Sequence, residues 1–261
     1  MSVGRLENLF KSRAGKLLSI FLMPGYPRLE STVPTAKALI EEGVDFLEIG
    51  MPFSDPLADG PVIQQAGQRS LQNGMNLSRL LEDVAEIREH SEIPLVLMGY
   101  ANPLFQYGIE AFFARCEEIG VDACILPDVP LEEYRRHFAA AMKKHHQRII
   151  FLVSSVTPLE RVRELDAESG GFLDVVSSPS VTGTSSAVGQ MNTGFIREVS
   201  ELGLQNPLMV GFGIRDAATF SRATEFARGG IVGSAFLEAM KESTGKEREI
   251  VKTFVLSIRN G

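Results

Sequence analysis

Short apolar runs rich in β-branched residues recur along the chain, and each is followed by a loop and a longer segment with helical periodicity. About eight of these runs are predicted strands, at residues 17–23, 44–49, 94–98, 121–126, 148–153, 172–176, 207–210 and 230–232. Several are almost continuously apolar, which is typical of parallel strands covered on both faces. The alternation therefore predicts an α/β fold with helices packed around a parallel sheet.

The length of the chain favours closing that sheet into a barrel. A (β/α)8 TIM barrel typically needs about 250 residues, and this chain has 261. Residues 5–12 predict an extra N-terminal helix, and residues 235–240 predict a short helix after strand eight. The sequence Gly-Val-Asp at both 43–45 and 120–122 favours repeated units over an open doubly wound sheet. We find no linker, so we expect a single barrel domain spanning residues 1–261.

Charge and cysteine content narrow the class of protein. Lys plus Arg number 26 against 33 Asp plus Glu, a net charge of −7, and no basic cluster suits a nucleic-acid backbone. The apolar run at 17–23 is far shorter than the ~20 residues that span a bilayer. Cys116 and Cys124 are too few for a disulfide framework. We therefore expect a cytoplasmic protein that binds neither nucleic acid nor membrane.

The active site of such a barrel lies at the C-terminal ends of its strands, where this chain has few polar residues. In the second strand, the period of two places Phe46 and Glu48 on one face, and Leu47 and Ile49 on the other. If Leu47 and Ile49 pack on the helices, Glu48 points into the barrel mouth. Poor solvation there raises the pKa of a carboxyl and suits general acid–base catalysis. The alternative is a structural glutamate paired with an arginine.

The loop after this strand, residues 50–61, is rich in proline and aspartate. Asp59-Gly60-Pro61 fits a plain turn with Pro61 at the first position of a helix, so the role of Asp59 stays open at this point. The histidines and lysines fall before strands or within predicted helices. Their placement disfavours Schiff-base and metal-dependent chemistry, and we predict no metal site.

Two glycine-bearing turns, Gly211-Phe212-Gly213 and Gly233-Ser234, follow the last two predicted strands. Backbone N–H groups of such loops, together with the N-terminus of a short extra helix, hold phosphate in many barrels. We therefore expect a phosphate site here, with Ser234 capping the helix; tight turns alone are the alternative. The long segment 177–190, rich in small residues, predicts a mobile lid, or else a surface loop without function.

Several motifs are similar to those of one known family. They are Phe46-Leu47-Glu48-Ile49-Gly50, Pro52-Phe53-Ser54-Asp55-Pro56, Ala58-Asp59-Gly60-Pro61, Val181-Thr182-Gly183, Gly211-Phe212-Gly213-Ile214 and Gly233-Ser234-Ala235. Over essentially its whole length the chain resembles the alpha subunits of tryptophan synthase. The resemblance implies a carbon–carbon lyase of L-tryptophan biosynthesis, which cleaves indole-3-glycerol phosphate to indole and glyceraldehyde 3-phosphate. It also implies no cofactor in this chain, because pyridoxal phosphate is expected in the beta subunit that receives the indole.

The resemblance implies roles for individual residues as well. Glu48 would shuttle protons at the ring carbon and the hydroxyl, and Asp59 would accept from the indole N–H. The implied substrate-binding residues are Phe21, Tyr100, Thr182, Gly183, Phe212, Gly213, Gly233 and Ser234. We expect the beta subunit at the catalytic face, in an alpha2beta2 tetramer. The residues expected at this interface are Pro52, Phe53, Asp55, Asn102, Pro103 and Phe105.

Two positions depart from the family pattern. Tyr26 stands where the family usually has aspartate, and Asp174 stands where tyrosine is common. The resemblance places Asp174 near Glu48, and two carboxyls in one poorly solvated site are expected to titrate jointly. Two other functions stay open: a free-standing indole-releasing lyase, and a catalytically weak allosteric partner of a beta subunit.

Overall fold

The computed structural model describes residues 4–176, 192–243 and 245–260. Its strands form one parallel sheet in the order β5-β4-β3-β2-β1-β9-β8-β7-β6. Their bounds are β1 Leu17–Leu22, β2 Phe46–Gly50, β3 Leu95–Met98, β4 Ala123–Ile125, β5 Ile149–Ile150, β6 Leu152–Ser154, β7 Leu173–Val176, β8 Leu208–Gly211 and β9 Gly229–Val232. A strand lies within every one of the predicted segments, apart from shifts of one or two residues at the ends.

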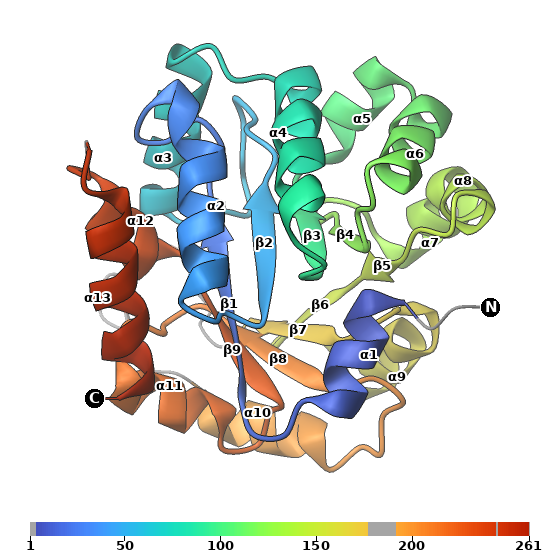
Figure 1. Cartoon of the computed structure of the whole chain (residues 1–261). Helices are drawn as coiled ribbons and strands as arrows, with labels where there is room; N and C mark the ends of the chain where they lie inside the picture. The colour runs from blue at the N-terminus through green and yellow to red at the C-terminus, as the bar shows by residue number, and fades with distance from the viewer. Residues whose placement is uncertain (1–3, 177–191, 244, 261) are drawn as a thin grey trace.

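The two edges of the sheet are consecutive in the chain. β5 pairs with β4, and β6 pairs with β7. Only Phe151 separates β5 from β6, and together the two correspond to the one strand predicted at 148–153. The sheet therefore returns to its starting point and forms a nearly closed parallel barrel, which confirms the expected TIM-barrel-like fold (Figure 1).

Helices surround this barrel (Figure 1). Their bounds are α1 Arg5–Ser12, η1 Leu29–Ser31, α2 Thr32–Glu41, α3 Pro61–Gln72, α4 Leu77–His90, α5 Ala101–Tyr107, α6 Ile109–Glu118, α7 Leu131–Glu133, η2 Tyr134–Phe138, α8 Ala139–Lys144, α9 Leu159–Glu168, α10 Thr193–Ser200, α11 Ala217–Thr224, α12 Ser234–Met240 and α13 Glu247–Arg259. The extra N-terminal helix has the predicted bounds. The short helix after the last strand is also present, and it begins one residue earlier than predicted.

Successive residues of each strand pack alternately into two apolar cores, one outside and one inside the barrel. Leu18 and Ile20 of β1 pack outward against the helices, whereas Leu17 and Phe21 belong to the core inside the barrel. Phe46 and Phe172 meet across that interior with ring centroids 5.5 Å apart. Burial of each such side chain contributes roughly 1.5–3 kcal/mol. The middle of the barrel is thus filled by apolar side chains.

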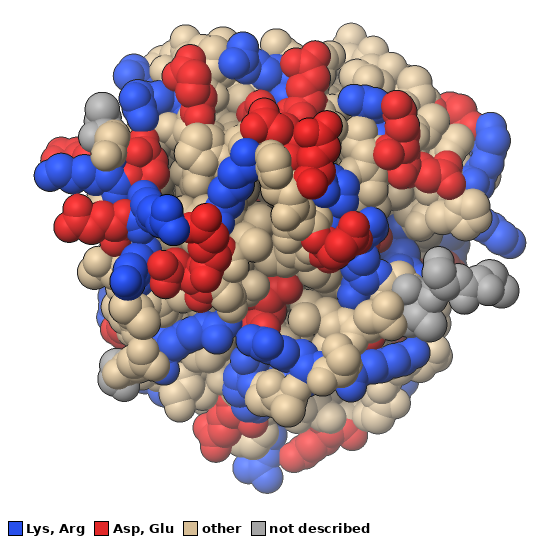
Figure 2. Space-filling view, viewed as in Figure 1, with Lys and Arg blue, Asp and Glu red and all other residues tan. Residues whose placement is uncertain are grey.

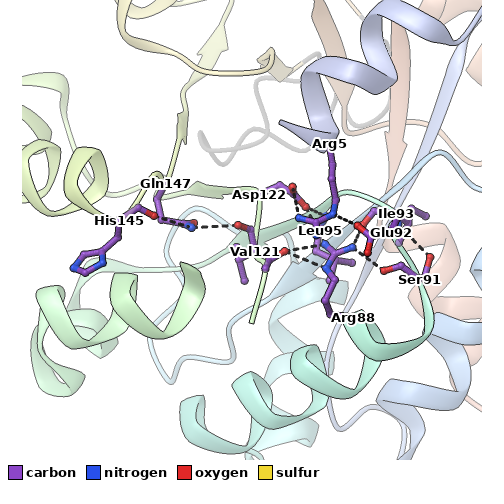
Figure 3. A network of polar contacts seen from close by, with 11 residues as sticks. Arg5, Arg88, Ser91, Glu92, Ile93, Leu95, Val121, Asp122, His145 and Gln147 are labelled. Atoms are coloured by element: carbon purple, nitrogen blue, oxygen red, sulfur yellow. Dashed lines mark hydrogen bonds and ion pairs between the residues drawn. The ribbon is translucent and has the colours of Figure 1, made fainter. Parts of the chain in front are cut away.

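The N-terminal end of the barrel is covered by α1. Phe10 of this helix contacts Phe172, with ring centroids 6.0 Å apart. Beside it, Asp122 accepts hydrogen bonds from the Arg88 side chain and the Leu95 backbone N–H, both at 2.9 Å, and Arg5 approaches the same carboxylate at 3.5 Å (Figure 3). These contacts join α1 and α4 to the strands, so this end serves stability, as is usual for the lower face of a barrel.

The surface carries mixed charge. On the face shown in Figure 2, acidic and basic side chains are interspersed. Ion pairs such as Arg28 with Glu247 and Lys37 with Glu86 join segments that lie far apart in sequence. Among the helices in the described part of the chain, none is both long enough and apolar enough to cross a membrane.

Candidate active site

Glu48 lies on β2 and its side chain points into the barrel. Its neighbours Leu47 and Ile49 pack in the outer core, whereas Phe46 packs in the inner one. Glu48 is only 3% exposed, yet it lines a cavity at the C-terminal end of the barrel. The orientation predicted from the period of two is therefore confirmed.

Asp174 reaches the same cavity from the opposite wall. It lies on β7, which is separated from β2 by β1, β9 and β8. Leu173 and Val175 pack outward, so Asp174 points inward, and it is also 3% exposed. Two carboxyl groups from strands far apart in the sheet thus face one space.

Burial raises the pKa of both carboxyls, and neighbouring carboxylates raise that of Glu48 further. The pKa of Glu48 is raised well above 4.5, mainly by burial and further by the charges of Asp174 and Asp59. Burial raises the pKa of Asp174 to about 7, and a hydrogen bond from the Gly211 backbone opposes this rise. Carboxyls whose pKa is raised in this way can donate protons as well as accept them, which suits them to acid–base catalysis.

The cavity between these carboxyls has a volume of about 220 Å³. Its lining residues are Phe21, Glu48, Ile63, Met98, Asp174, Gly211, Phe212, Gly213, Ile214, Arg215, Ile231, Gly233, Ser234, Ala235 and Glu238. Since one water occupies about 30 Å³ in the liquid, this space admits a small organic molecule. Apolar walls around a few convergent polar groups are typical of a ligand site.

The turns after β8 and β9 form one side of the cavity, as predicted. Phe212 and Gly213 both have positive φ, +71° and +76°, so the backbone turns sharply at the cavity wall. Gly233 is the N-cap of α12, whose first residue is Ser234. The first N–H groups of a helix have no partner within the helix and attract anions. The expected cap by Ser234 is wrong: the Ser234 side chain makes no capping hydrogen bond, because Gly233 occupies the cap position.

Asp59 lies beside the cavity, although it is not among its lining residues. The Tyr100 hydroxyl donates a hydrogen bond to the Asp59 carboxylate and accepts one from the Ala58 backbone N–H at 3.1 Å. Burial raises the pKa of Asp59 to about 6, and the Tyr100 hydrogen bond opposes the rise. Pro61 does begin α3, but the N-cap is Gly60 without any side-chain cap. The Asp59 carboxylate therefore does not cap this helix.

Reasoning from the sequence missed two charged residues at the cavity. Arg215 follows the turn after β8, and Glu238 lies on α12; both are exposed and line the cavity. A cation two residues after the Gly-Phe-Gly turn was the available sequence signal for Arg215. Tyr26 does not line this cavity, and it packs instead beside Phe236 and Met240 of α12. The predicted binding residues Thr182 and Gly183, with the rest of the expected lid, lie outside the described residues.

The residues expected at a partner interface lie near the same end of the barrel. Pro52, Phe53 and Asp55 follow β2, and the Phe53 ring lies 5.3 Å from that of Tyr100. The other three, Asn102, Pro103 and Phe105, lie on α5 after β3. Phe105 is 53% exposed although its ring contacts Phe138, and Leu57 in the β2 loop is 86% exposed.

Within residues 4–176, 192–243 and 245–260, no group of three or more His, Cys, Asp or Glu side chains is arranged to hold a metal ion.

Comparison with known proteins extends the similarity seen in the motifs. The family model for the tryptophan synthase alpha chain matches residues 8–260. A tryptophan synthase alpha chain of Flavobacterium psychrophilum is 44% identical over 87% of this chain and 90% of its own length. The crystal structure of tryptophan synthase subunit alpha from Legionella pneumophila has a TM-score of 0.87 at 32% identity, covering 99% of this chain and 98% of its own. The structure of a tryptophan synthase complex from Pyrococcus furiosus has a TM-score of 0.83 at 30% identity, with coverages of 94% and 98%.

Proposed function

The chain belongs to the tryptophan synthase alpha chain family, and from this we propose that Glu48 and Asp59 are its catalytic residues. Its function is that of a carbon–carbon lyase of tryptophan biosynthesis, the cleavage of indole-3-glycerol phosphate to indole and glyceraldehyde 3-phosphate. The family needs no cofactor of its own, since pyridoxal phosphate belongs to the beta subunit.

One observation carries the assignment of Glu48: a buried carboxyl with a raised pKa lines the cavity at the C-terminal end of the barrel. The retro-aldol cleavage needs a proton on the indole carbon that bears the glycerol chain. It also needs removal of the proton from the adjacent hydroxyl. A carboxyl whose pKa is raised can give a proton to the ring carbon and take one from the hydroxyl.

Asp59 is proposed to act at the nitrogen of the indole ring. When the indole carbon is protonated, positive charge develops at the ring nitrogen, and a carboxylate that accepts from this N–H stabilises it. Tyr100 supports the role, because its hydroxyl donates to Asp59 and fixes the carboxylate beside the cavity. The apolar side chains of Phe21 and Phe212, which line the cavity, would then border the indole ring.

The phosphate of the substrate is proposed to bind at the turns after β8 and β9. Gly213, Gly233 and Ser234 bring backbone N–H groups and the N-terminal end of α12 to the cavity. Thr182 and Gly183 are proposed to complete this site through the segment after β7. Arg215, which lines the same side, adds a positive charge.

Substitution of the two carboxyls tests these roles. Glu48→Gln is expected to lower kcat for indole release by at least ~100-fold, the lower range for a positioned acid–base group. Asp59→Asn is expected to lower it as well, since an amide no longer balances charge on the ring nitrogen. Glu92→Gln is the matched control, because Glu92 is exposed at the opposite end of the barrel. Near-normal turnover by folded Glu48→Gln protein would refute the assignment.

The Pyrococcus furiosus relative was solved as a tryptophan synthase complex, and we propose that this chain likewise binds a beta subunit, in an alpha2beta2 tetramer. Pro52, Phe53, Asp55 and the exposed side of α5, with Asn102, Pro103 and Phe105, would form the contact. We also propose one barrel domain for the whole chain. A cytoplasmic location is proposed because the cysteines of the described residues are free and buried, as suits a reducing compartment.

An indole-release assay with and without a beta subunit separates the remaining alternatives. A free-standing lyase turns over rapidly alone. A catalytically weak allosteric partner releases little indole in either condition. An alpha subunit of a working complex is slow alone and is stimulated by its partner.

A further inference from the structure

Two buried carboxyl oxygens at the cavity lack partners. Glu48 Oε2 and Asp174 Oδ1 are both fully buried, and neither has a hydrogen-bond partner among the described residues. Buried polar atoms in folded proteins are nearly always paired, and an unpaired one is unfavourable by about 1–3 kcal/mol. Both residues line the same cavity from opposite strands, so the two carboxyl groups meet one shared space.

The charges around the two carboxyls do not neutralise them. Those that act on Glu48 are the carboxylates of Asp174 and Asp59. Of the other charged groups that line the cavity, Arg215 and Glu238 are exposed at its rim. Two negative charges held together in a poorly solvated site repel strongly, so the pair retains a proton over a wide pH range.

Asp174 is held in place by the strand beside it. The Gly211 backbone of β8 donates a hydrogen bond to its carboxyl. A Cβ atom at position 211 would lie 2.9 Å from Asp174 Oδ1. A glycine is therefore needed beside this carboxyl, and the local structure accommodates Asp174 at the cavity wall.

We propose that Glu48 and Asp174 form one acid–base pair that shares a single proton, and that each carboxyl performs one of the two proton transfers in the cleavage. The inference rests on the proposed function and adds a second carboxyl to it. Asp174 is thereby assigned as a catalytic residue of this chain.

The protons balance over one turnover. The protonated carboxyl gives its proton to the indole carbon that carries the glycerol chain. The ionised carboxylate then takes the proton of the adjacent hydroxyl, the O–H electron pair becomes part of the aldehyde C=O, and the C–C bond breaks. The electron pair of that bond returns to the ring and restores indole. The pair still holds one proton, now on the other carboxyl, and a transfer within the pair resets it.

The pH profile of kcat tests this directly. The singly protonated pair is active, so the wild-type rate falls at low pH, where no base remains, and at high pH, where no acid remains. Asp174→Asn keeps the shape but removes one titrating group and one negative charge. We expect kcat to fall by about 10-fold or more, since Glu48 must then perform both transfers. We also expect the alkaline limb to move to lower pH by about one unit or more, because the pKa of Glu48 falls without its charged neighbour.

A matched control and a second measurement complete the test. Asp83→Asn makes the same change at a carboxyl on α4, outside the barrel, where burial also raises the pKa. This control variant should keep the wild-type alkaline limb. Asp59 titrates in every variant compared, so its contribution is common to all profiles. If Asp174→Asn folds poorly, a second measurement takes the place of its pH profile. The Asp174 carboxyl is labelled with ¹³C and titrated by infrared spectroscopy, in the wild type and in Glu48→Gln protein. The pKa of Asp174 should then be lower in Glu48→Gln protein than in the wild type.

The possible outcomes separate this inference from the proposed function. The shared-proton pair would be overturned if Asp174→Asn kept both the wild-type kcat and the wild-type alkaline limb. It would also be overturned if the pKa of Asp174 were the same in Glu48→Gln protein as in the wild type. Glu48→Gln would still abolish cleavage in that case. Retained cleavage in Glu48→Gln would overturn the proposed function itself.

Discussion

The buried carboxyl of Asp174 makes the protein less stable as the pH rises. Burial raises the pKa of Asp174 from 3.8 to about 7. The folded state therefore holds a proton at pH values where the unfolded chain has released it. A group with a raised pKa stabilises the fold fully below its unfolded pKa, and this contribution is lost as pH rises through the folded value. We predict that Asp174→Asn removes this dependence.

The expected magnitude follows from the pKa. At about 1.4 kcal/mol per pKa unit, a rise from 3.8 to about 7 corresponds to about 4 kcal/mol in total. About 3 kcal/mol of it falls between pH 5 and the folded pKa, a range where most folded proteins can be measured. The wild type should thus lose about 3 kcal/mol more stability than Asp174→Asn between pH 5 and pH 8.

Urea unfolding at pH 5 and pH 8 measures this difference. Because every other titrating group is common to the two proteins, the comparison isolates the carboxyl at position 174 and its effect on Glu48. The denaturant dependence of the unfolding free energy should be equal in both proteins, which shows that the same surface unfolds. If the wild type and the variant lose the same stability between the two pH values, the pKa of Asp174 is not raised by burial and the reasoning fails.

Three further predictions concern other parts of the molecule. Gly233→Asp has space for its side chain, since a Cβ atom would meet Phe21 no closer than 3.5 Å. Charge repulsion should raise KM for indole-3-glycerol phosphate by ~10-fold or more, while a dephosphorylated analogue binds as before. Phe105→Ala should weaken stimulation by a beta subunit more than cleavage by the isolated chain; equal losses in the two assays would place Phe105 in the active site. Arg88→Ala should lower the free energy of unfolding in urea by about 3 kcal/mol, because it leaves the buried Asp122 carboxylate with only the Leu95 N–H and the more distant Arg5. Arg115→Ala, which breaks an exposed pair with Glu118, should lower it by less than about 1 kcal/mol.

The sequence predicted the strands and their faces because the rule behind them is local. One face of each barrel strand packs against the helices and the other faces the barrel interior. Successive side chains of the strand therefore alternate between these two environments. This reasoning places Glu48 inward once Leu47 and Ile49 are taken to face the helices, as they do. It also explains why the bounds of α1 were correct, since an amphipathic segment needs only its own periodicity.

Relations across the barrel could not be predicted in this way. Whether Asp174 stands at the height of Glu48 depends on how the strands are staggered when the sheet closes, and no local pattern encodes the stagger. Only the family resemblance suggested their proximity. Arg215 and Glu238 were missed for a similar reason, because the path of the turn after β8 and the rotation of α12 decide which side chains meet the cavity. The prediction that Ser234 caps α12 was wrong because the helix begins one residue earlier than expected, and helix boundaries often differ by this much.

The two ends of the barrel use the same apolar interior in opposite ways. At the N-terminal end, Arg88 and a backbone N–H satisfy the buried carboxylate of Asp122, and Phe10 excludes water. At the C-terminal end, Glu48 and Asp174 have buried oxygens without partners among the described residues. Burial raises the pKa of both carboxyls, and this rise is what makes them useful for proton transfer. A cation placed near Glu48 would stabilise the fold at neutral pH and lower the pKa that catalysis needs. The stability lost at the catalytic end must therefore be supplied elsewhere, and the paired charges and aromatic contacts beneath α1 are suited to supply it.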